Sequence, residues 1–285
     1  MTTFEKGSAT AKGGFANERA ICSKFDNWRK DSEAQLWLKI MGYNLEKIDS
    51  VSAIQIPVRM KKEHVKELGH VKELGLEETY EETYEELMKF KKTDVRIIIT
   101  IGNIIKVENL SLKKANSDAD YNQVDKRWVD TYKEMWGFDD EIAFGLKLFT
   151  GEINPYSYPD IIKGKPLRDK RRMFLDELPE KLSNKIISFF TDNKILVVSD
   201  ILKGRGGLSA NWMLVTRYNK NDDTTTWILK DINEAMKVLG SGNVEMSPRG
   251  SLYIGKITMQ RKGGTPDPTK LQFKIKPCDL FELEK

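Results

Sequence analysis

Residues 94–113 read DVRIIITIGNIIKVENLSLK and predict a β-hairpin. Val95–Ile101 is rich in β-branched residues, which favour strands, and residues 104–113 predict a second strand. Only Gly102 and Asn103 separate these segments, and a two-residue connection of this kind suits a tight hairpin turn. The chain is organised around this hairpin, because the turn sets the register of its two strands.

The register decides which residues meet at the open end of the hairpin. If Ile101 faces Ile104, Asp94 lies opposite Ser111. Side chains alternate along a strand, so Lys113 points to the same face as Ser111 and Asp94. One carboxylate, one hydroxyl group and one ammonium group therefore converge at one point.

This arrangement resembles the metal-dependent nuclease site that is written PD-(D/E)xK. In such a site the aspartate binds a divalent cation, the second position adds an oxygen ligand, and the lysine orients or activates the attacking water. The same residue types at strand ends are also common on solvated surfaces, so the pattern needs context. Glu108 is an alternative second carboxylate, but it points to the opposite face, and a β-bulge would be needed to bring it in.

The context comes from long blocks of sequence beyond the hairpin. They resemble the type II restriction endonucleases that cut the four-base site GCGC and, more distantly, the MspI-like enzymes that cut CCGG. The likeness follows the chain in order through residues 6–48, the block KKANSDADYNQVDKRW at 113–128, LFTGEINPY at 148–156, DKRRMF at 169–174, SDILKGRGG at 199–207, residues 240–264 and LQFKI at 271–275.

The resemblance implies an α/β fold with a central mixed β-sheet flanked by helices, formed by a single endonuclease domain over residues 1–285. It implies a type II site-specific deoxyribonuclease that hydrolyses phosphodiester bonds of double-stranded DNA with Mg²⁺, at a short GC-only palindrome such as GCGC. A cognate DNA methyltransferase would be its functional partner, and a monomer and a homodimer both suit a palindrome. A repair or structure-specific nuclease of this fold and a DNA-binding protein with an inactive site are the rival interpretations.

The catalytic residues that we expect are Asp94, Ser111, Lys113 and Glu18, with Asp94 and Glu18 as the metal ligands. Glu18 lies on the first turns of a predicted amphipathic helix, and in nucleases of this architecture a helix glutamate often reaches the metal site. The GCGC cutters carry glutamine where this chain has Ser111, and serine is a shorter and weaker ligand. Glu18 or a bridging water would then carry more of the coordination.

Basic and amide side chains next to the predicted strands indicate a DNA-binding face. Arginine reads guanine through O6 and N7, and a GC-only site offers a guanine in every base pair. The resemblance places an aromatic residue at the Tyr121 position, where a ring could wedge between base steps, and a glutamine at the Gln123 position, which could fill the gap. The expected DNA contacts are Tyr121, Gln123, Lys126, Lys203, Arg205, Arg249, Gln260, Arg261, Lys262, Gln272 and Lys274, of which Arg249, Gln260, Arg261 and Gln272 are the candidates for base contact.

Composition agrees with a globular nucleic-acid enzyme without demanding one. The net charge of +4 over 285 residues permits DNA binding. The two cysteines, Cys22 and Cys278, lie far apart and in no metal-binding pattern. No signal peptide and no long apolar run appears, so we expect a protein of the bacterial cytoplasm with no membrane contact.

Residues 61–90 predict a charged helical insertion. The segment HVKELG occurs twice in tandem at 64–69 and 70–75, and EETY occurs twice at 77–80 and 81–84. The family members are shorter here, so short duplications have enlarged the insertion. Its acidic residues argue against contact with phosphate, and a solvated appendage is the simpler interpretation.

Hydrophobic periodicity predicts the remaining elements. A polar, Gly-rich lead precedes the first helix, and Trp128, Tyr132 and Trp136 form a core-facing stripe on a later helix. The expected elements are helices at 15–30, 32–42, 124–138, 140–149 and 232–240, a buried strand at 193–202, an antiparallel pair at 210–218 and 224–231, and two strands at 251–262 and 271–275.

Overall fold

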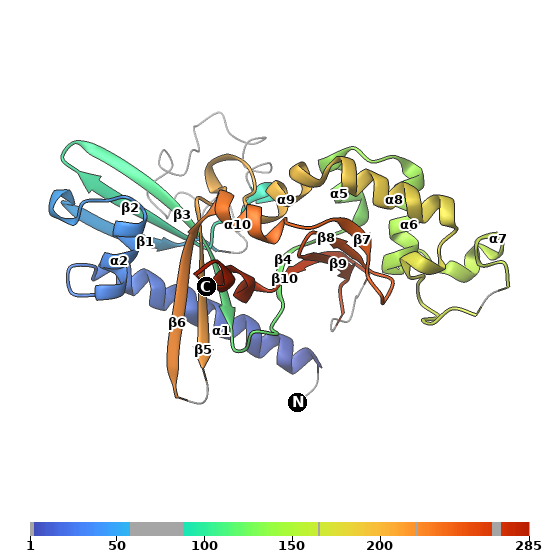
Figure 1. The fold of residues 1–285 in the computed structure, drawn as a ribbon, viewed down its shortest axis with the longest axis horizontal. Helices are drawn as coiled ribbons and strands as arrows, with labels where there is room; N and C mark the ends of the chain where they lie inside the picture. The colour runs from blue at the N-terminus through green and yellow to red at the C-terminus, as the bar shows by residue number, and fades with distance from the viewer. Residues whose placement is uncertain (1–2, 58–87, 165, 220–221, 264–268, 285) are drawn as a thin grey trace. The chain divides into compact units, whose positions relative to one another are not determined.

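The computed structural model describes residues 3–57, 88–164, 166–219, 222–263 and 269–284. The chain divides into two compact units, and each contains a five-stranded sheet (Figure 1). The hairpin unit comprises residues 9–120, 202–236 and 277–285, and the second unit comprises residues 1–8, 121–201 and 237–276. Most of the predicted insertion at 61–90 falls outside the described residues.

The sheet of the hairpin unit is mixed, as predicted. Its strands lie in the order β1-β2-β3-β5-β6, with β3 and β5 parallel and the other neighbours antiparallel. The strands are β1 (Ser50–Gln55), β2 (Val95–Ile101), β3 (Ile104–Ala115), β5 (Trp212–Asn219) and β6 (Thr224–Asp231).

The predicted register of the hairpin is confirmed. Ile101 pairs with Ile104 across the turn, and Val95 pairs with Leu110 at the other end, with no break in between. Gly102 has a φ of 57°, a left-handed conformation that favours glycine in this turn. The face of each side chain therefore follows directly from its residue number.

One face of the β2–β3 hairpin forms the core of this unit. Helices α1 (Thr3–Asp26) and α2 (Ser32–Ile40) pack against it (Figure 1). Phe25 and Trp37 lie 5.3 Å apart between their ring centroids and are both buried against the strands. Burial of a large apolar side chain contributes about 1.5–3 kcal/mol, so this cluster holds the hairpin in place.

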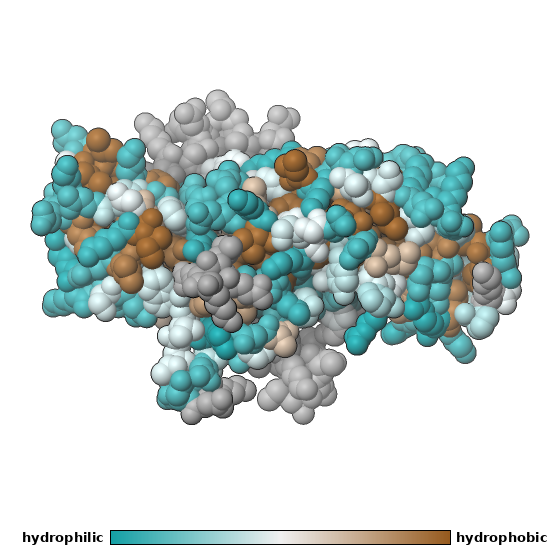
Figure 2. All heavy atoms as spheres, viewed as in Figure 1, coloured by the Kyte–Doolittle hydropathy of each residue, from teal (hydrophilic) through white to brown (hydrophobic). Residues whose placement is uncertain are grey.

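The turn end of the hairpin is exposed instead. Ile104 and Ile105 expose 55% and 54% of their surface. Figure 2 shows apolar residues at the surface of the end of the hairpin unit where this turn and α2 lie. The hairpin is thus anchored by the opposite end, which carries Asp94.

Helix α1 begins earlier than predicted. It starts at Thr3 and passes through Gly13 and Gly14, where the sequence predicts a polar lead. A glycine inside a helix costs about 1 kcal/mol relative to alanine, which made a boundary at this pair the simpler prediction. Helix α2 follows the prediction and ends before Gly42, whose φ is 89°.

A polar network ties the base of the hairpin to residues 206–211. Arg96 is 1% exposed and donates from Nε to Asn109 Oδ1 at 2.9 Å and from Nη2 to the Gly207 carbonyl. Asn109 Nδ2 donates to the carbonyls of Gly207 and Ser209 at 3.0 and 2.8 Å. The turn η4 (Gly206–Leu208) is thereby held against the strands.

The second unit contains an antiparallel sheet with strand order β4-β10-β9-β8-β7. Its strands are β4 (Asn122–Arg127), β7 (Val244–Met246), β8 (Leu252–Ile254), β9 (Ile257–Arg261) and β10 (Leu271–Ile275). Its helices are α5 (Val129–Trp136), α6 (Asp140–Thr150), α7 (Pro159–Ile162), α8 (Glu180–Asp192) and α9 (Lys194–Leu202), and α10 (Ile232–Leu239) crosses the boundary between the units.

The predicted helix at 124–138 begins only at Val129. Residues 122–127 form β4 instead, because pairing with β10 overrides their local preference. Tyr132 and Trp136 are core residues, as predicted, and their rings stack 4.7 Å apart. Trp128 is 38% exposed and precedes the helix, so the prediction for this residue was wrong.

Two further predictions of strands need correction. Residues 194–202 form the helix α9, with Ile195 85% exposed and Val197 and Ile201 buried. A short apolar run is compatible with both a buried strand and a buried helix, so composition could not separate them. Residues 251–262 form two strands, β8 and β9, because Gly255 adopts a φ of 60° between them.

Within the described part of the chain, no helix is long and apolar enough to cross a membrane.

We predict that Arg96→Met destabilises the protein by about 2–3 kcal/mol, because the buried Asn109 Oδ1 loses the Arg96 donor and the Gly207 carbonyl loses one of its two donors. Urea unfolding would measure this as a lower midpoint. Arg217→Met is the control, since Arg217 pairs with Asp118 at the surface and such pairs contribute at most about 1 kcal/mol. Equal midpoints for the two variants would show that the Arg96 network is not a structural anchor.

Candidate active site

Asp94, Ser111 and Lys113 meet at the open end of the hairpin. Lys113 Nζ lies 2.9 Å from Ser111 Oγ and 3.5 Å from Asp94 Oδ2. Ser111 Oγ lies 3.5 Å from the same Asp94 oxygen. The side chain of Lys113 is only 12% exposed, so its ammonium is held close to the carboxylate. The structure brings these three residues together as the sequence predicts.

Asp94 is fixed where β2 begins. Its backbone N–H donates to the Leu110 carbonyl at 2.8 Å, and its Oδ2 accepts from the Leu112 N–H at 2.7 Å. The carboxylate thus occupies the position where another backbone carbonyl would continue the ladder. A group held in this way needs no reorganisation before it binds a cation.

Glu18 on α1 approaches the same end of the hairpin. Gln55 Nε2, at the end of β1, donates to Glu18 Oε2 at 2.6 Å. Burial is the largest effect on the pKa of Glu18 and raises it, and the negative charge of Asp94 raises it further. The lysines Lys91 and Lys113 act in the opposite direction. The two carboxylates therefore lie within electrostatic range of one another.

Glu108 lies on the opposite face of the hairpin. It accepts hydrogen bonds from Tyr43 Oη at 2.6 Å and Trp212 Nε1 at 2.8 Å. Burial and this carboxylate raise the pKa of Tyr43. The β2–β3 register contains no bulge that would turn Glu108 towards Asp94. Glu108 is therefore hydrogen-bonded at the edge of the hydrophobic core and is not part of the Asp94 site.

The donor set suits a hard divalent cation. Asp94, Glu18 and the Ser111 hydroxyl supply oxygen ligands, which Mg²⁺ and similar ions prefer. Among the described residues, no three of His, Cys, Asp and Glu form a metal-binding group. Water and a DNA phosphate would complete the coordination, as is usual for Mg²⁺ sites with one or two carboxylates.

Lys203 and Arg205 lie on a loop that contacts the segment preceding Asp94. Thr93 donates from Oγ1 to the Leu208 carbonyl at 2.7 Å, and the guanidinium of Arg205 lies 4.3 Å from the Phe90 ring centroid. Gly204 makes this approach possible, since its φ is 75° and an added Cβ would meet the Phe90 carbonyl oxygen at 1.9 Å. These two basic residues therefore belong to the surroundings of the site.

The strand register of the second unit sorts the other expected DNA contacts. Gln272 pairs with both Gln260 and Lys126, and Lys274 pairs with Gln123 across a bulge. Because paired side chains share a face, these five residues lie on one face of the sheet. Lys262, two residues after Gln260, continues this face by alternation. Burial lowers the pKa of Lys262 and of Lys274.

Arg261 and Gln272 are placed differently from the rest. Arg261 points to the other face, where its Nη1 lies 3.3 Å from Asp169 Oδ2 and its side chain is 8% exposed. Gln272 is 1% exposed and donates to the Arg261 carbonyl at 3.3 Å, while its Oε1 lacks a hydrogen-bond donor in the described structure. Neither side chain is exposed for contact with DNA, because both are buried and hydrogen-bonded within the protein.

Tyr121 and Arg249 are exposed. Tyr121 exposes 47% of its surface, and Lys276 Nζ lies 5.2 Å from its ring centroid. Arg249 follows β7 in a turn that contains Gly250. An exposed ring on a loop retains the freedom that insertion between bases requires.

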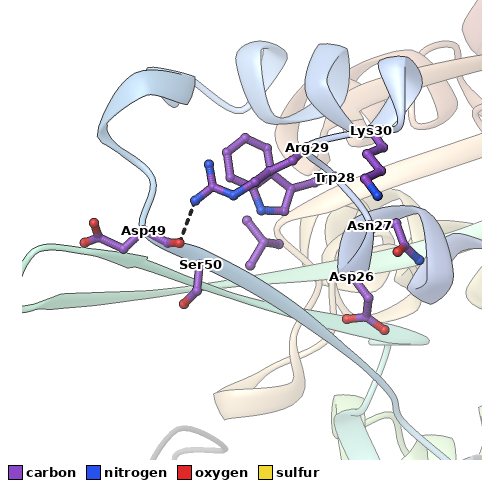
Figure 3. A pocket seen from close by; sticks show the side chains of 8 residues that line it. Asp26, Asn27, Trp28, Arg29, Lys30, Asp49 and Ser50 are labelled. Atoms are coloured by element: carbon purple, nitrogen blue, oxygen red, sulfur yellow. Dashed lines mark hydrogen bonds between the residues drawn. The ribbon is translucent and has the colours of Figure 1, made fainter.

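A pocket of about 320 Å³ lies at the other end of β1, away from Gln55 (Figure 3). Arg29 lines it, stacks 4.4 Å from the Trp28 ring centroid and donates to the Asp49 carbonyl at 2.8 Å. Asp26 accepts from the Ala53 N–H at 2.8 Å. These polar groups join α1 to β1, so the pocket is a feature of packing between them.

Two residues of the site were missed by the sequence analysis. Gln55 contacts Glu18, and Lys91 interacts electrostatically with both Asp94 and Glu18. A lysine three residues before Asp94 is a visible signal, but the run Lys91-Lys92 also suits a solvated strand end. The positions of Gln55 and Lys91 depend on β1, which only the tertiary structure places beside β2.

A mixed sheet whose central hairpin presents Asp94, Ser111 and Lys113 at one end defines a nuclease of the restriction-endonuclease fold. Among solved structures, the chain is similar to the crystal structure of restriction endonuclease MspI in complex with its cognate DNA. The TM-score is 0.54 at 12% sequence identity, covering 90% of this chain and 87% of that one. At this identity, the likeness shows the fold.

The chain belongs to the R.HinP1I restriction endonuclease family, whose family profile matches residues 86–281. It is a type II site-specific deoxyribonuclease, as the sequence predicts. No curated protein sequence matches it significantly. The match includes Asp94, Ser111 and Lys113 but begins after Glu18, so the assignment of Glu18 depends on the geometry of this chain.

We predict that Lys113→Ala lowers the cleavage rate at least ~100-fold, the loss expected of a general base, while DNA binding survives. Single-turnover cleavage and a binding titration without metal would measure the two effects. Lys114→Ala is the matched control, because it removes the same charge from the neighbouring residue, which is exposed. A Lys113→Ala variant that cuts at more than about a tenth of the native rate would remove this lysine from the mechanism.

We predict that Glu18→Gln raises the divalent-ion requirement for cleavage, with partial rescue by Mn²⁺, which binds nitrogen and oxygen sites differently from Mg²⁺. Burial disfavours the Glu18 anion, and this penalty is present in full above its raised folded-state pKa. Without metal at neutral pH, the variant is therefore expected to melt at the same or a higher temperature. Glu46→Gln, on an exposed turn of the same unit, is the control. An unchanged metal titration would exclude Glu18 as a ligand.

Proposed function

We propose that the enzyme hydrolyses phosphodiester bonds of double-stranded DNA at a short GC-only palindrome such as GCGC, with Mg²⁺ as its cofactor. The observation that carries the proposal is the cluster of Asp94, Ser111 and Lys113, with Lys113 Nζ at 2.9 Å from Ser111 Oγ and 3.5 Å from Asp94 Oδ2. The approach of Glu18 adds the second anion that a dication needs.

In this proposal, each residue of the site has one task. Asp94 and Glu18 hold the divalent ion, and Ser111 contributes its hydroxyl directly or through a water. The ion stabilises negative charge on the phosphorus oxygens when it is bound. Lys113 orients the water, or takes its proton when the amine is neutral, and the water oxygen forms a bond to phosphorus as the bond from phosphorus to the leaving oxygen breaks. Asp94 keeps the Lys113 ammonium in place.

Recognition is assigned to the second unit and to the loop beside the site. The face that contains Lys126, Gln260, Lys262 and Lys274 offers ammonium groups for phosphates and an amide for a base edge. Arg205 and Lys203 would bind the backbone near the cut, and Arg249 and Tyr121 are exposed candidates for contact with bases. MspI, whose fold this chain shares, was crystallised in complex with its cognate DNA, which supports the same kind of substrate here.

Type II restriction also implies a cellular setting. A palindromic site requires two symmetric cuts, which either a monomer acting twice or a homodimer would supply. A DNA methyltransferase with the same site would protect the host chromosome. We propose that both enzymes act in the bacterial cytoplasm, where the chromosome is.

Digestion of a sequenced plasmid in Mg²⁺, followed by sequencing of the ends, tests this function. Discrete fragments whose ends share one GC-only palindrome are expected, and prior methylation of that site should block cutting. Lys113→Ala protein purified in parallel excludes a contaminating nuclease. A smear would indicate a nuclease without site specificity, and ends at an A/T-containing sequence would reject the proposed site.

A further inference from the structure

The turn that precedes β8 is held in one conformation. Residues 247–250 read Ser-Pro-Arg-Gly, an order that favours a tight β-turn with proline second and glycine last. The Gly250 N–H donates to the Ser247 carbonyl at 2.9 Å and closes the turn. Ser247 is buried, and its Oγ accepts from the Ser251 N–H at 3.0 Å. The backbone of Arg249 is therefore fixed from both sides.

A second segment of the same unit packs directly against this turn. The Leu175 N–H donates to the Gly250 carbonyl at 2.9 Å. Gly250 has a φ of 71°, and an added Cβ would meet Asp176 Oδ1 and, at 2.7 Å, Phe174 Cβ. No other side chain fits at this position, because it would be both strained and crowded. The turn and residues 174–176 thus approach one another as closely as their backbones allow.

Glu177 holds that second segment in shape. Its side chain is 14% exposed, and its Oε2 accepts from the Phe174 N–H at 2.8 Å. Its Oε1 accepts from the backbone N–H of Arg168 at 2.9 Å and from Arg168 Nε at 3.2 Å. The Arg168 guanidinium lies 4.2 Å from the Phe174 ring centroid and pairs with Asp176. One carboxylate therefore joins the two ends of segment 168–177 beside Gly250.

The same segment also holds the end of β9. Asp169 Oδ2 lies 3.3 Å from Nη1 of Arg261, whose side chain is 8% exposed. Gln260, the residue before Arg261, points to the opposite face, which is the face assigned to DNA. Segment 168–177 thus contacts the chain before β8 and again where β9 ends. This double attachment fixes the position of Arg249 relative to Gln260.

The Arg249 side chain is available to a ligand. It is exposed, and within the described part of the chain its guanidinium has no hydrogen bond, ion pair or ring contact. Arg168 and Arg171, in the supporting segment, are paired with carboxylates instead. A contact to phosphate tolerates a mobile side chain, whereas a bidentate contact to a base edge needs a guanidinium held in one place. A braced backbone under an unpaired arginine favours the contact to a base.

We propose that Arg249 reads guanine by donating two hydrogen bonds to N7 and O6, and that Glu177 is a positioning residue that acts through Arg249. This inference rests on the proposed function and names the residues that select the base within it. Glu177 does not touch the DNA. It keeps residues 174–176 against Gly250, so that the Arg249 guanidinium meets the base edge without a prior rearrangement.

Modified DNA tests the contact of Arg249 itself. Duplexes that contain the cleaved site would carry 7-deazaguanine at one guanine position at a time, because this base keeps its pairing but lacks N7. The specificity constant of the native protein in Mg²⁺ is expected to fall ~10- to 100-fold at one guanine of each half-site, as when one hydrogen bond to a charged group is lost. Arg249→Ala should cleave the modified and unmodified duplexes equally well at that position.

A double-mutant cycle tests whether Glu177 acts through Arg249. Glu177→Ala is expected to remove most of the sensitivity to 7-deazaguanine, and Glu177→Gln, which keeps one acceptor oxygen, should remove less. When Arg249 is already alanine, Glu177→Ala should cause no further loss, because nothing remains for Glu177 to position. Independent and additive losses would show that Glu177 only supports the fold.

Matched variants separate this role from a general loss of stability. Gly250→Ala crowds the turn and should reproduce the behaviour of Arg249→Ala. Gly242→Ala has a left-handed φ of 98° as well, but its added Cβ meets nothing nearer than 3.6 Å, so it should keep the native selectivity. Glu180→Ala removes an exposed charge three residues after Glu177 and should also behave as the native protein. Thermal melting would establish that every variant is folded.

The outcomes distinguish this inference from the proposed function. A native protein that gives no discrete fragments would reject the proposed function, and this inference with it. If the native protein cuts at a defined site but Arg249→Ala keeps its sensitivity to 7-deazaguanine, the inference alone is wrong. An equal loss of affinity for every duplex, with a salt slope lower by about 1, would assign Arg249 to a phosphate and would also overturn it. Native selectivity in Glu177→Ala would reject the positioning role.

Discussion

The hydrogen bond from the Leu112 N–H to Asp94 Oδ2, at 2.7 Å, is the contact on which the active site depends. It replaces a backbone bond of the β-ladder with one to a side chain, so the carboxylate is as firmly placed as the strand itself. A bond from a backbone amide to a charged acceptor is stronger than a neutral one. Ser111 and Lys113 stand on either side of Leu112, and their positions follow from the same strand.

The two faces of the β2–β3 hairpin have different roles: one packs against the helices, and the other carries the site residues. One face packs Val95 and Ile97 against the helices and includes Glu108, which accepts hydrogen bonds from Tyr43 and Trp212. The other face carries Asp94, Ser111 and Lys113. A slip of one residue would exchange the two faces and move Asp94, Ser111 and Lys113 apart. The buried Arg96 network, one pair inward from Asp94, holds the base of the hairpin to the loop at 206–211 and opposes such a slip.

The site holds opposite charges close together without burying them completely. Asp94 and Lys113 expose 28% and 12% of their side chains, so water and a phosphate still have access. Full burial of these charges would cost more than their attraction returns. Burial and the nearby negative charge of Asp94 raise the pKa of Glu18, and a bound dication would favour its anion directly.

The sequence by itself determined the hairpin, its register and the convergence of Asp94, Ser111 and Lys113, because alternation along two strands joined by a two-residue turn is a local rule. It also contained the family blocks that identified the enzyme. It could not determine α9 or β4, since an apolar run suits a helix or a strand, and a polar segment becomes a strand only when β10 pairs with it. Only the tertiary structure brought Gln55 to Glu18, because this contact joins two segments whose separation in sequence leaves no periodic signal. It also turned Arg261 away from the face of Gln260, because adjacent residues of a strand must point to opposite sides.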